Sequence, residues 1–217
     1  MKKFWDLRYS QPEYAYGKEP NRYFEYILSN LKPGKILLPA EGEGRNAVFA
    51  AENGWKVTAV DFSTKARDKA LNYADERNVT MNYLISDVEK YAFPENEYDV
   101  AALIYAHFPP QCRTNIHRSV IKSIKPGGTL IVEAFSKKQI NNNTGGPREV
   151  NLLYDLEELL YDFKGLVIGV AAETEIELSE GIYHKGRADV IRILAKKHIE
   201  GTQSVIFTDF EKNCSKV

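Results

Sequence analysis

Residues 35–47 of the chain read KILLPAEGEGRNA, and this stretch decides the fold. It begins with a short apolar run, which predicts a buried strand over residues 35–38. Gly42 and Gly44 follow, and glycines at this spacing let the backbone turn tightly and approach a ligand closely. A helix is predicted from about Arg45, so its N-terminus would face that ligand. The stretch therefore predicts a strand, a ligand-binding turn and a helix in direct succession.

Strands and helices alternate on both sides of this stretch. Apolar runs bounded by turn residues predict strands, and capping residues followed by a 3.6-residue period predict helices. The predicted strands cover residues 35–38, 55–60, 81–85, 98–105 and 129–135, with helices beginning near Pro20, Arg45, Ser63, Pro109 and Asp155. Residues 125–128, KPGG, predict a turn before the fifth strand. The first 18 residues are predicted to be irregular.

The end of the chain breaks this alternation. Two extended segments, residues 167–177 and 187–195, are joined by a turn at residues 179–181. Alternating strands and helices form a parallel sheet with helices on both faces, and a closing strand pair forms an antiparallel hairpin. We predict an α/β fold: a doubly wound, Rossmann-like, seven-stranded mixed sheet with a C-terminal antiparallel hairpin. Residues 1–197 would form one domain, and residues 198–217 an extension of unknown role.

Composition narrows the class of protein. The 217 residues carry 29 basic and 30 acidic side chains, a near-neutral balance that gives no electrostatic footprint for nucleic acid. The longest apolar runs, residues 100–106 and 166–172, are far shorter than the roughly 20 residues of a membrane span. Cys112 and Cys214 are too few for a disulfide framework or a structural zinc site. We expect a cytoplasmic protein, monomeric or homodimeric, without a metal, a membrane or a nucleic-acid partner.

Two carboxylates follow predicted strands where this kind of sheet binds ligands. Asp61 ends the second strand, where it could accept both hydroxyls of a ribose. Asp87 follows the third strand, placed for the exocyclic amine of an adenine. The sequence therefore predicts an adenosine-containing cofactor. Residues 42–47, GEGRNA, also fit the dinucleotide pattern, so NAD stays open beside S-adenosylmethionine. The KPGG turn and the closing hairpin favour S-adenosylmethionine.

Seven short motifs carry a resemblance to a known family. They are FWDLRY at 4–9, YGKEPN at 16–21, GEGRN at 42–46, AHFPP at 106–110, KPGG at 125–128, TGGP at 144–147 and EGIYHKG at 180–186. Over about residues 4–197 the chain resembles the class I S-adenosylmethionine-dependent methyltransferases, and more narrowly the branch of tellurite-resistance and thiopurine methyltransferases. The resemblance implies methyl transfer to a small-molecule acceptor, such as a thiol or an oxyanion.

The resemblance also assigns residues to the cofactor. An aromatic arm, residues 1–18, would close over the sulfonium, which aromatic faces attract. The family's acidic residue at the end of the first strand is Leu38 here, and its glycine two positions later is Ala40; Glu41 could compensate for the missing carboxylate. The predicted cofactor-binding residues are Trp5, Tyr16, Glu41, Gly42, Gly44, Asn46, Asp61, Phe62, Asp87, Val88 and His107.

Histidines are the candidates for removing a proton from the acceptor, because their pKa lies near neutrality. His107 ends the fourth strand, and His184 lies in the closing hairpin at a position that resembles an active-site histidine of the tellurite-resistance branch. An ionised thiol would need no base. His117 and His198 are expected to be solvated, and the loop of residues 137–148 is expected to border the acceptor pocket.

Two other functions stay open from the sequence. An NAD-dependent oxidoreductase could use the same glycine turn. A non-catalytic S-adenosylmethionine-binding protein would fit the departures at Leu38 and Ala40.

Overall fold

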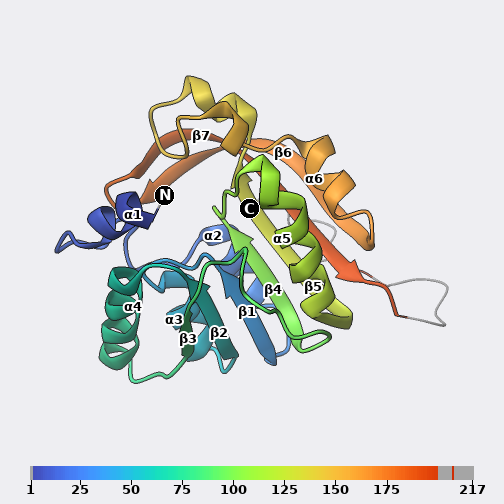
Figure 1. The fold of residues 1–217 in the computed structure, drawn as a ribbon, viewed down its shortest axis with the longest axis horizontal. Helices are drawn as coiled ribbons and strands as arrows, with labels where there is room; N and C mark the ends of the chain where they lie inside the picture. Colours follow the sequence, from blue (N-terminus) through green and yellow to red (C-terminus); the bar gives the residue numbers. More distant parts are fainter. Residues whose placement is uncertain (1, 200–206, 208–217) are drawn as a thin grey trace.

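The computed structural model describes residues 2–199 and Phe207, and it contains one seven-stranded sheet (Figure 1). The strand order is β3-β2-β1-β4-β5-β7-β6, and β7 runs antiparallel to both β5 and β6. The other neighbours are parallel. The strands are β1 Lys35–Pro39, β2 Lys56–Asp61, β3 Asn82–Ile85, β4 Tyr98–Ile104, β5 Ile124–Phe135, β6 Leu166–Glu180 and β7 His184–Lys197. The predicted mixed sheet with its closing hairpin is confirmed.

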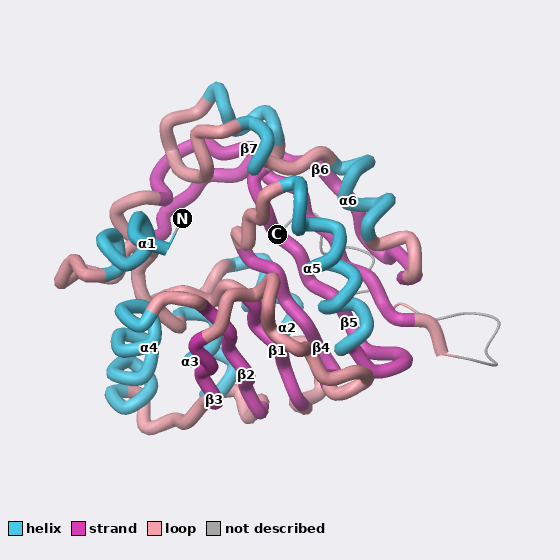
Figure 2. Tube along the Cα trace, in the orientation of Figure 1, coloured by secondary structure: helices cyan, strands magenta, loops and turns pink. Residues whose placement is uncertain are grey.

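Helices cover both faces of the sheet, as Figure 2 shows. The helices are α1 Lys2–Tyr9, α2 Arg22–Leu28, α3 Arg45–Glu52, α4 Thr64–Glu76, α5 Pro110–Ser123 and α6 Leu156–Asp162, with 3-10 turns η1 Lys137–Asn141 and η2 Val150–Leu152. Ile36 and Leu38 pack with α2 and α3 on one face, whereas Leu37 packs with the α5 and α6 side chains on the other. Because successive side chains of a strand alternate, a strand covered on both faces is apolar throughout.

Capping residues place the helix starts as the sequence indicated. The Ser63 hydroxyl accepts the N–H of Ala66 at 3.2 Å and begins α4. The Asp155 carboxylate accepts the N–H groups of Glu157 and Glu158 and begins α6. Such caps satisfy backbone donors that have no partner within the helix, which is why these residue types favour helix starts.

Three predicted boundaries are wrong. Residues 2–9 form α1 rather than an irregular arm, with Trp5 stacked on Tyr9 one turn later. Residues 125–128 do not precede β5; they form an irregularity within it, where the pairing with β4 jumps from Tyr98↔Ile124 to Val100↔Thr129. The hairpin strands extend to Glu180 and from His184, so the turn lies at residues 181–183 rather than at residues 179–181. Most of the predicted C-terminal extension, residues 198–217, lies outside the described residues.

None of the helices in residues 2–199 is long and apolar enough to cross a membrane.

Candidate functional site

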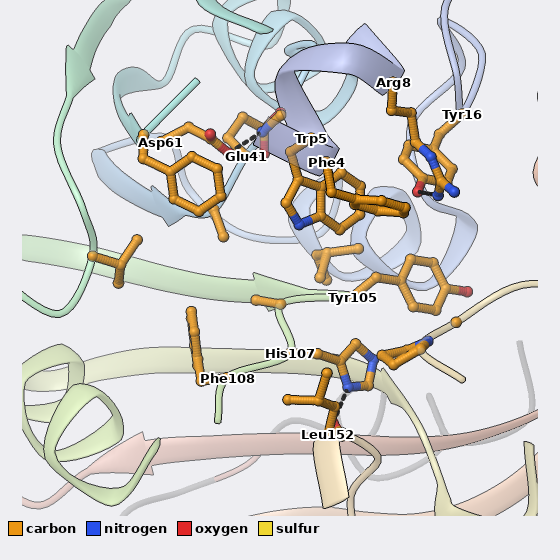
Figure 3. Close-up of a pocket in the computed structure, with 18 of the residues that line it drawn as sticks. Phe4, Trp5, Arg8, Tyr16, Glu41, Asp61, Tyr105, His107, Phe108 and Leu152 are labelled. Atoms are coloured by element: carbon orange, nitrogen blue, oxygen red, sulfur yellow. Dashed lines mark hydrogen bonds between the residues drawn. The ribbon is translucent and has the colours of Figure 1, made fainter. Parts of the chain in front are cut away.

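A cavity of about 1390 Å³ lies at the carboxyl ends of the parallel strands. Figure 3 shows Glu41 and Asp61 on one side, Trp5 beneath α1, and His107 on the opposite side. Ligand pockets commonly measure roughly 300–1,000 Å³, so this one has room for a cofactor and a second small molecule together. Of the predicted site residues, Gly44 alone does not line the cavity. The residues that line it are Trp5, Tyr16, Glu41, Gly42, Asn46, Asp61, Phe62, Asp87, Val88, His107 and His184.

The glycine turn after β1 requires a left-handed backbone at three positions. The φ angles are 55° at Ala40, 67° at Gly42 and 88° at Gly44. A Cβ on Gly44 would lie 2.6 Å from the Cβ of Ala70, so a glycine is needed here for α3 to pack against α4. Ala40 adopts its conformation with a side chain, which strains the backbone.

Asp61 ends β2 and closes this turn. One carboxylate oxygen accepts the N–H of Gly42 at 3.0 Å, and the other accepts the N–H of Ser63 at 2.9 Å. Burial raises the pKa of Asp61 to about 6, against the lowering by these backbone donors. Each carboxylate oxygen can accept more than one hydrogen bond, so the carboxylate retains capacity to accept from a ligand hydroxyl group.

Glu41 projects from the same turn into the cavity. Its Oε1 accepts the N–H of Ala47 at 2.8 Å. Burial raises the pKa of Glu41 to about 7, and the nearby Arg45 charge only partly offsets this effect. Leu38, by contrast, is buried in the apolar cluster with α2 and α3 and does not line the cavity. Together Glu41 and Asp61 give this side of the cavity acidic character.

The N-terminal arm is fixed between the glycine turn and the β6–β7 turn. The N–H of Ala15 donates to the Glu43 carboxylate at 2.7 Å, and the N–H of Ile182 donates to the Ala15 carbonyl at 3.2 Å. A Cβ on Gly181 would meet the backbone N of Gly17 at 2.5 Å, so the two chain segments touch through glycines. The arm thereby places Trp5 over the cavity (Figure 3).

His184 begins β7 and is buried beside a charged pair. Its Nδ1 lies 3.0 Å from the Glu180 carboxylate, which also accepts from Arg45 Nη2 at 2.9 Å. Burial would raise the pKa of Glu180, but Arg45 and His184 outweigh it and hold that pKa at about 2. Burial lowers the pKa of His184 although Glu180 opposes this shift, so the ring is neutral at pH 7. Because Nδ1 faces a carboxylate, it carries the proton and Nε2 has the lone pair.

His107 lies on the cavity wall with both ring nitrogens engaged. Nδ1 donates to the Leu152 carbonyl at 2.8 Å, and Nε2 accepts the N–H of Phe135 at 3.2 Å. Burial lowers the pKa of His107 to about 4. The ring stacks on Phe135 and Tyr154, with centroids 5.8 and 4.9 Å away. The geometry therefore favours His184 over His107 as a proton acceptor.

The remaining histidines differ in their surroundings. His117 is only 1% exposed, and its Nδ1 pairs with the Asp162 carboxylate at 2.8 Å between α5 and α6. The expectation that it is solvated was wrong, because that face of α5 packs against α6. His198 is exposed, as predicted.

Two functional candidates escaped the sequence analysis: Glu180 and Arg8. Glu180 and Arg45 lie 135 residues apart in the chain and pair only in the folded protein. The sequence could have indicated Glu180 as a candidate, because this carboxylate precedes His184 by four residues. Asp87 borders the cavity, and so does the second half of the predicted loop of residues 137–148, through Asn143, Gly145, Gly146, Pro147 and Arg148.

The known proteins that are similar to this chain include methyltransferases. Residues 36–128 match the family model of a methyltransferase domain. The chain is 22% identical over 145 residues to 2-heptyl-1-hydroxyquinolin-4(1H)-one methyltransferase of Mycobacteroides abscessus, covering 65% of this chain and 64% of that protein. It is 30% identical over 123 residues to the ubiquinone/menaquinone biosynthesis C-methyltransferase UbiE of Ectopseudomonas mendocina, covering 52% and 47%. The chain thus spans less than two thirds of these relatives.

Solved structures extend the likeness to nearly the whole chain. A SAM-dependent methyltransferase of Methanosarcina mazei superposes with a TM-score of 0.68 at 17% identity, covering 84% of this chain and 100% of that one. The fold is that of an S-adenosylmethionine-dependent methyltransferase. TehB of Haemophilus influenzae superposes with a TM-score of 0.69 at 16% identity, covering 90% and 66%. The match to a methyltransferase domain covers residues 36–128, and S-adenosylmethionine is the cofactor that this type of domain uses.

Proposed function

We propose that the protein transfers a methyl group from S-adenosylmethionine to a small molecule held in the same cavity. The observation that carries this proposal is the division of the cavity. The half-buried carboxyl group of Glu41 and the buried one of Asp61 lie on one side, and a neutral histidine with aromatic neighbours lies on the other. A cationic cofactor suits the first side, and an acceptor that must lose a proton suits the second.

The residues at the acidic side fit this cofactor. Asp61 would accept the ribose hydroxyls, and Asp87, Phe62 and Val88 would surround the adenine. Glu41 would bind the ammonium group of the cofactor. Its carboxylate would thereby replace the acidic residue that the family carries at the position of Leu38. Gly42 and Asn46 line the same end, while Trp5 and Tyr16 would lie over the sulfonium. When bound, S-adenosylmethionine supplies an electrophilic methyl group, and the chain's task is to align the acceptor and exclude water.

His184 is our candidate base. Its Nδ1–H donates to Glu180, so Nε2 can take the proton of an acceptor hydroxyl or thiol. Glu180 stays ionised above about pH 2 and holds the ring in this tautomer. His107, with both nitrogens bound to the backbone, is assigned to shaping the wall.

The acceptor side is lined by parallel rings. Tyr105 stacks on Phe135 at 4.6 Å and 22°, and Phe135 stacks on His107 at 15°. Such a wall favours a flat ring as acceptor, which agrees with the hydroxyquinolinone named for one relative. TehB among the similar structures supports the narrower tellurite-resistance and thiopurine branch, for which thiols and oxyanions are the alternative acceptors.

We also retain the organisation and setting inferred from the sequence. Residues 1–197 would form one catalytic domain with residues 1–18 as its cofactor-covering arm. The protein would work in the cytoplasm as a monomer or homodimer on a small molecule, without nucleic acid or a membrane.

Methyl transfer from labelled S-adenosylmethionine tests the proposal. The acceptors are thiophenol, a hydroxyquinolinone, an aromatic amine, selenite and tellurite. We expect label on a ring thiol or hydroxyl, and His184→Asn should lower kcat for the hydroxyl acceptor by roughly 10²–10⁴-fold while S-adenosylhomocysteine still binds. Binding without transfer to any acceptor would point to a non-catalytic binding protein, and binding of NAD instead would point to an oxidoreductase.

A further inference from the structure

Arg8, on α1, is a half-buried cation at the cavity whose charge has no carboxylate counterpart. Within residues 2–199, no Asp or Glu oxygen lies within 4.0 Å of its guanidinium. Arg45, the other arginine buried against the cavity, is already paired with Glu180 at 2.9 Å. An arginine that lines a ligand cavity without an acidic partner is available to an anionic ligand.

The guanidinium is held in a fixed orientation by its neighbours. Its central carbon lies 4.1 Å from the ring centroid of Tyr183, 4.6 Å from Phe4 and 5.3 Å from Trp5. Its Nη1 donates to the Tyr16 hydroxyl at 2.8 Å. Rings stacked on the faces of a guanidinium leave its N–H edge open, and that planar edge matches the two oxygens of a carboxylate. Little conformational entropy remains to be lost when an anion binds.

Arg8 belongs to the acceptor side of the cavity. Figure 3 shows Arg8 and Tyr16 together, across the cavity from Asp61. The Tyr16 ring lies 4.4 Å from the His184 ring, and Tyr183 precedes His184 in the chain. An anionic group at Arg8 would therefore lie close to the candidate base and apart from the Asp61 carboxylate.

We propose that Arg8 binds a carboxylate, or another oxyanion, of a molecule held in this cavity. The inference rests on the proposed function and deepens it, because it names the charge of the ligand. The oxyanion has two possible sources, an acidic substituent on the acceptor or the methionine carboxylate of the cofactor. The position beside His184 favours the acceptor, which would then be a flat ring that carries both a thiol or hydroxyl and an acidic group.

Two variants of α1 test this proposal. Arg8→Gln removes the cation but keeps a side chain that can donate to Tyr16. Lys3→Gln removes the same charge from an exposed position of α1 that does not line the cavity, and it serves as the matched control. Calorimetry without turnover compares S-adenosylhomocysteine with 5′-methylthioadenosine, which lacks the carboxylate. A second titration, of the S-adenosylhomocysteine complex, compares 4-mercaptobenzoate with thiophenol.

With an acidic acceptor, Arg8→Gln lowers the affinity ratio of 4-mercaptobenzoate to thiophenol by about 10- to 100-fold, because a charge-assisted hydrogen-bonded pair is lost. With the cofactor carboxylate as source, the ratio of S-adenosylhomocysteine to 5′-methylthioadenosine falls instead. Either result supports the proposal, provided that Lys3→Gln leaves both ratios unchanged. Unchanged ratios in Arg8→Gln overturn it and leave Arg8 as a packing residue of the arm. Because these readings need no turnover, they are independent of whether methyl transfer is found.

Discussion

Replacing Glu41 by glutamine should stabilise the free protein and weaken its binding of the cofactor. Burial raises the pKa of this carboxyl from 4.5 to about 7, so the folded protein holds a proton that the unfolded chain releases. Because the pKa of this acid is higher in the folded protein than in the unfolded chain, the free energy of unfolding falls as pH rises from about 4.5 to about 7. Above the folded-state pKa, the full decrease in the free energy of unfolding is present. Glutamine keeps the oxygen that accepts from Ala47 but carries no charge.

The size of the effect follows from the shift. At about 1.4 kcal/mol per pKa unit, the ionised Glu41 destabilises the free protein by about 3 kcal/mol at pH 8 and by almost nothing at pH 4. Glu41→Gln should therefore gain up to about 3 kcal/mol at pH 8 and little at pH 4. Binding should change in the opposite direction, because a hydrogen bond to a charged group contributes about 1.5–3 kcal/mol, which is roughly 10- to 150-fold in affinity.

Urea unfolding at pH 5, 6.5 and 8 measures the first effect, and calorimetric titration with S-adenosylhomocysteine at pH 8 measures the second. The matched ligand is 5′-methylthioadenosine, which lacks the ammonium group and should bind the variant as well as it binds the unaltered protein. Titrations at pH 7 in buffers of different ionisation enthalpy should also detect release of about half a proton with S-adenosylhomocysteine, since a group whose pKa is about 7 is then half protonated. A Glu41→Gln protein with unchanged S-adenosylhomocysteine affinity, or with no gain in stability at pH 8, would refute this reasoning.

Three further substitutions follow from the geometry. Ala40→Gly relieves a left-handed residue with φ 55° and should raise stability by up to about 1 kcal/mol, or about 2–4 °C in Tm; an unchanged or lower Tm contradicts the assigned strain. Gly181→Ala would place a Cβ 2.5 Å from the Gly17 nitrogen and should loosen the arm, seen as faster proteolysis within residues 1–18; equal proteolysis rates argue against the clamp. Glu180→Gln removes the charge that raises the pKa of His184, so the acid limb of the kcat profile should move to lower pH; an unmoved limb would mean that another group sets it.

The sequence predicted those parts of the fold that local patterns determine. Residues 35–47 lie in one strand–turn–helix unit, and the caps at Ser63 and Asp155 act within three residues of their own position. The helix α1 was missed because its eight residues have weak helical signals and it is stabilised by tertiary packing, with Tyr9 buried against Ala66.

The sequence predicted which residues lie at the site, but not how their side chains pair with one another. Strand ends placed Asp61 and His107 at the cavity, because that follows from topology, and the family resemblance placed His184 there. The pairing of Arg45 with Glu180, the double backbone engagement of His107 and the stacking of Arg8 depend on residues distant in sequence. A single sequence carries no direct signal for such contacts.

Calorimetric titration with S-adenosylhomocysteine and with NAD decides whether this cavity is a site for S-adenosylmethionine. We expect saturable one-to-one binding of S-adenosylhomocysteine, strongly weakened by Asp61→Ala, and no binding of NAD. Binding of NAD, or S-adenosylhomocysteine binding that survives the loss of both Asp61 and Glu41, would contradict this expectation.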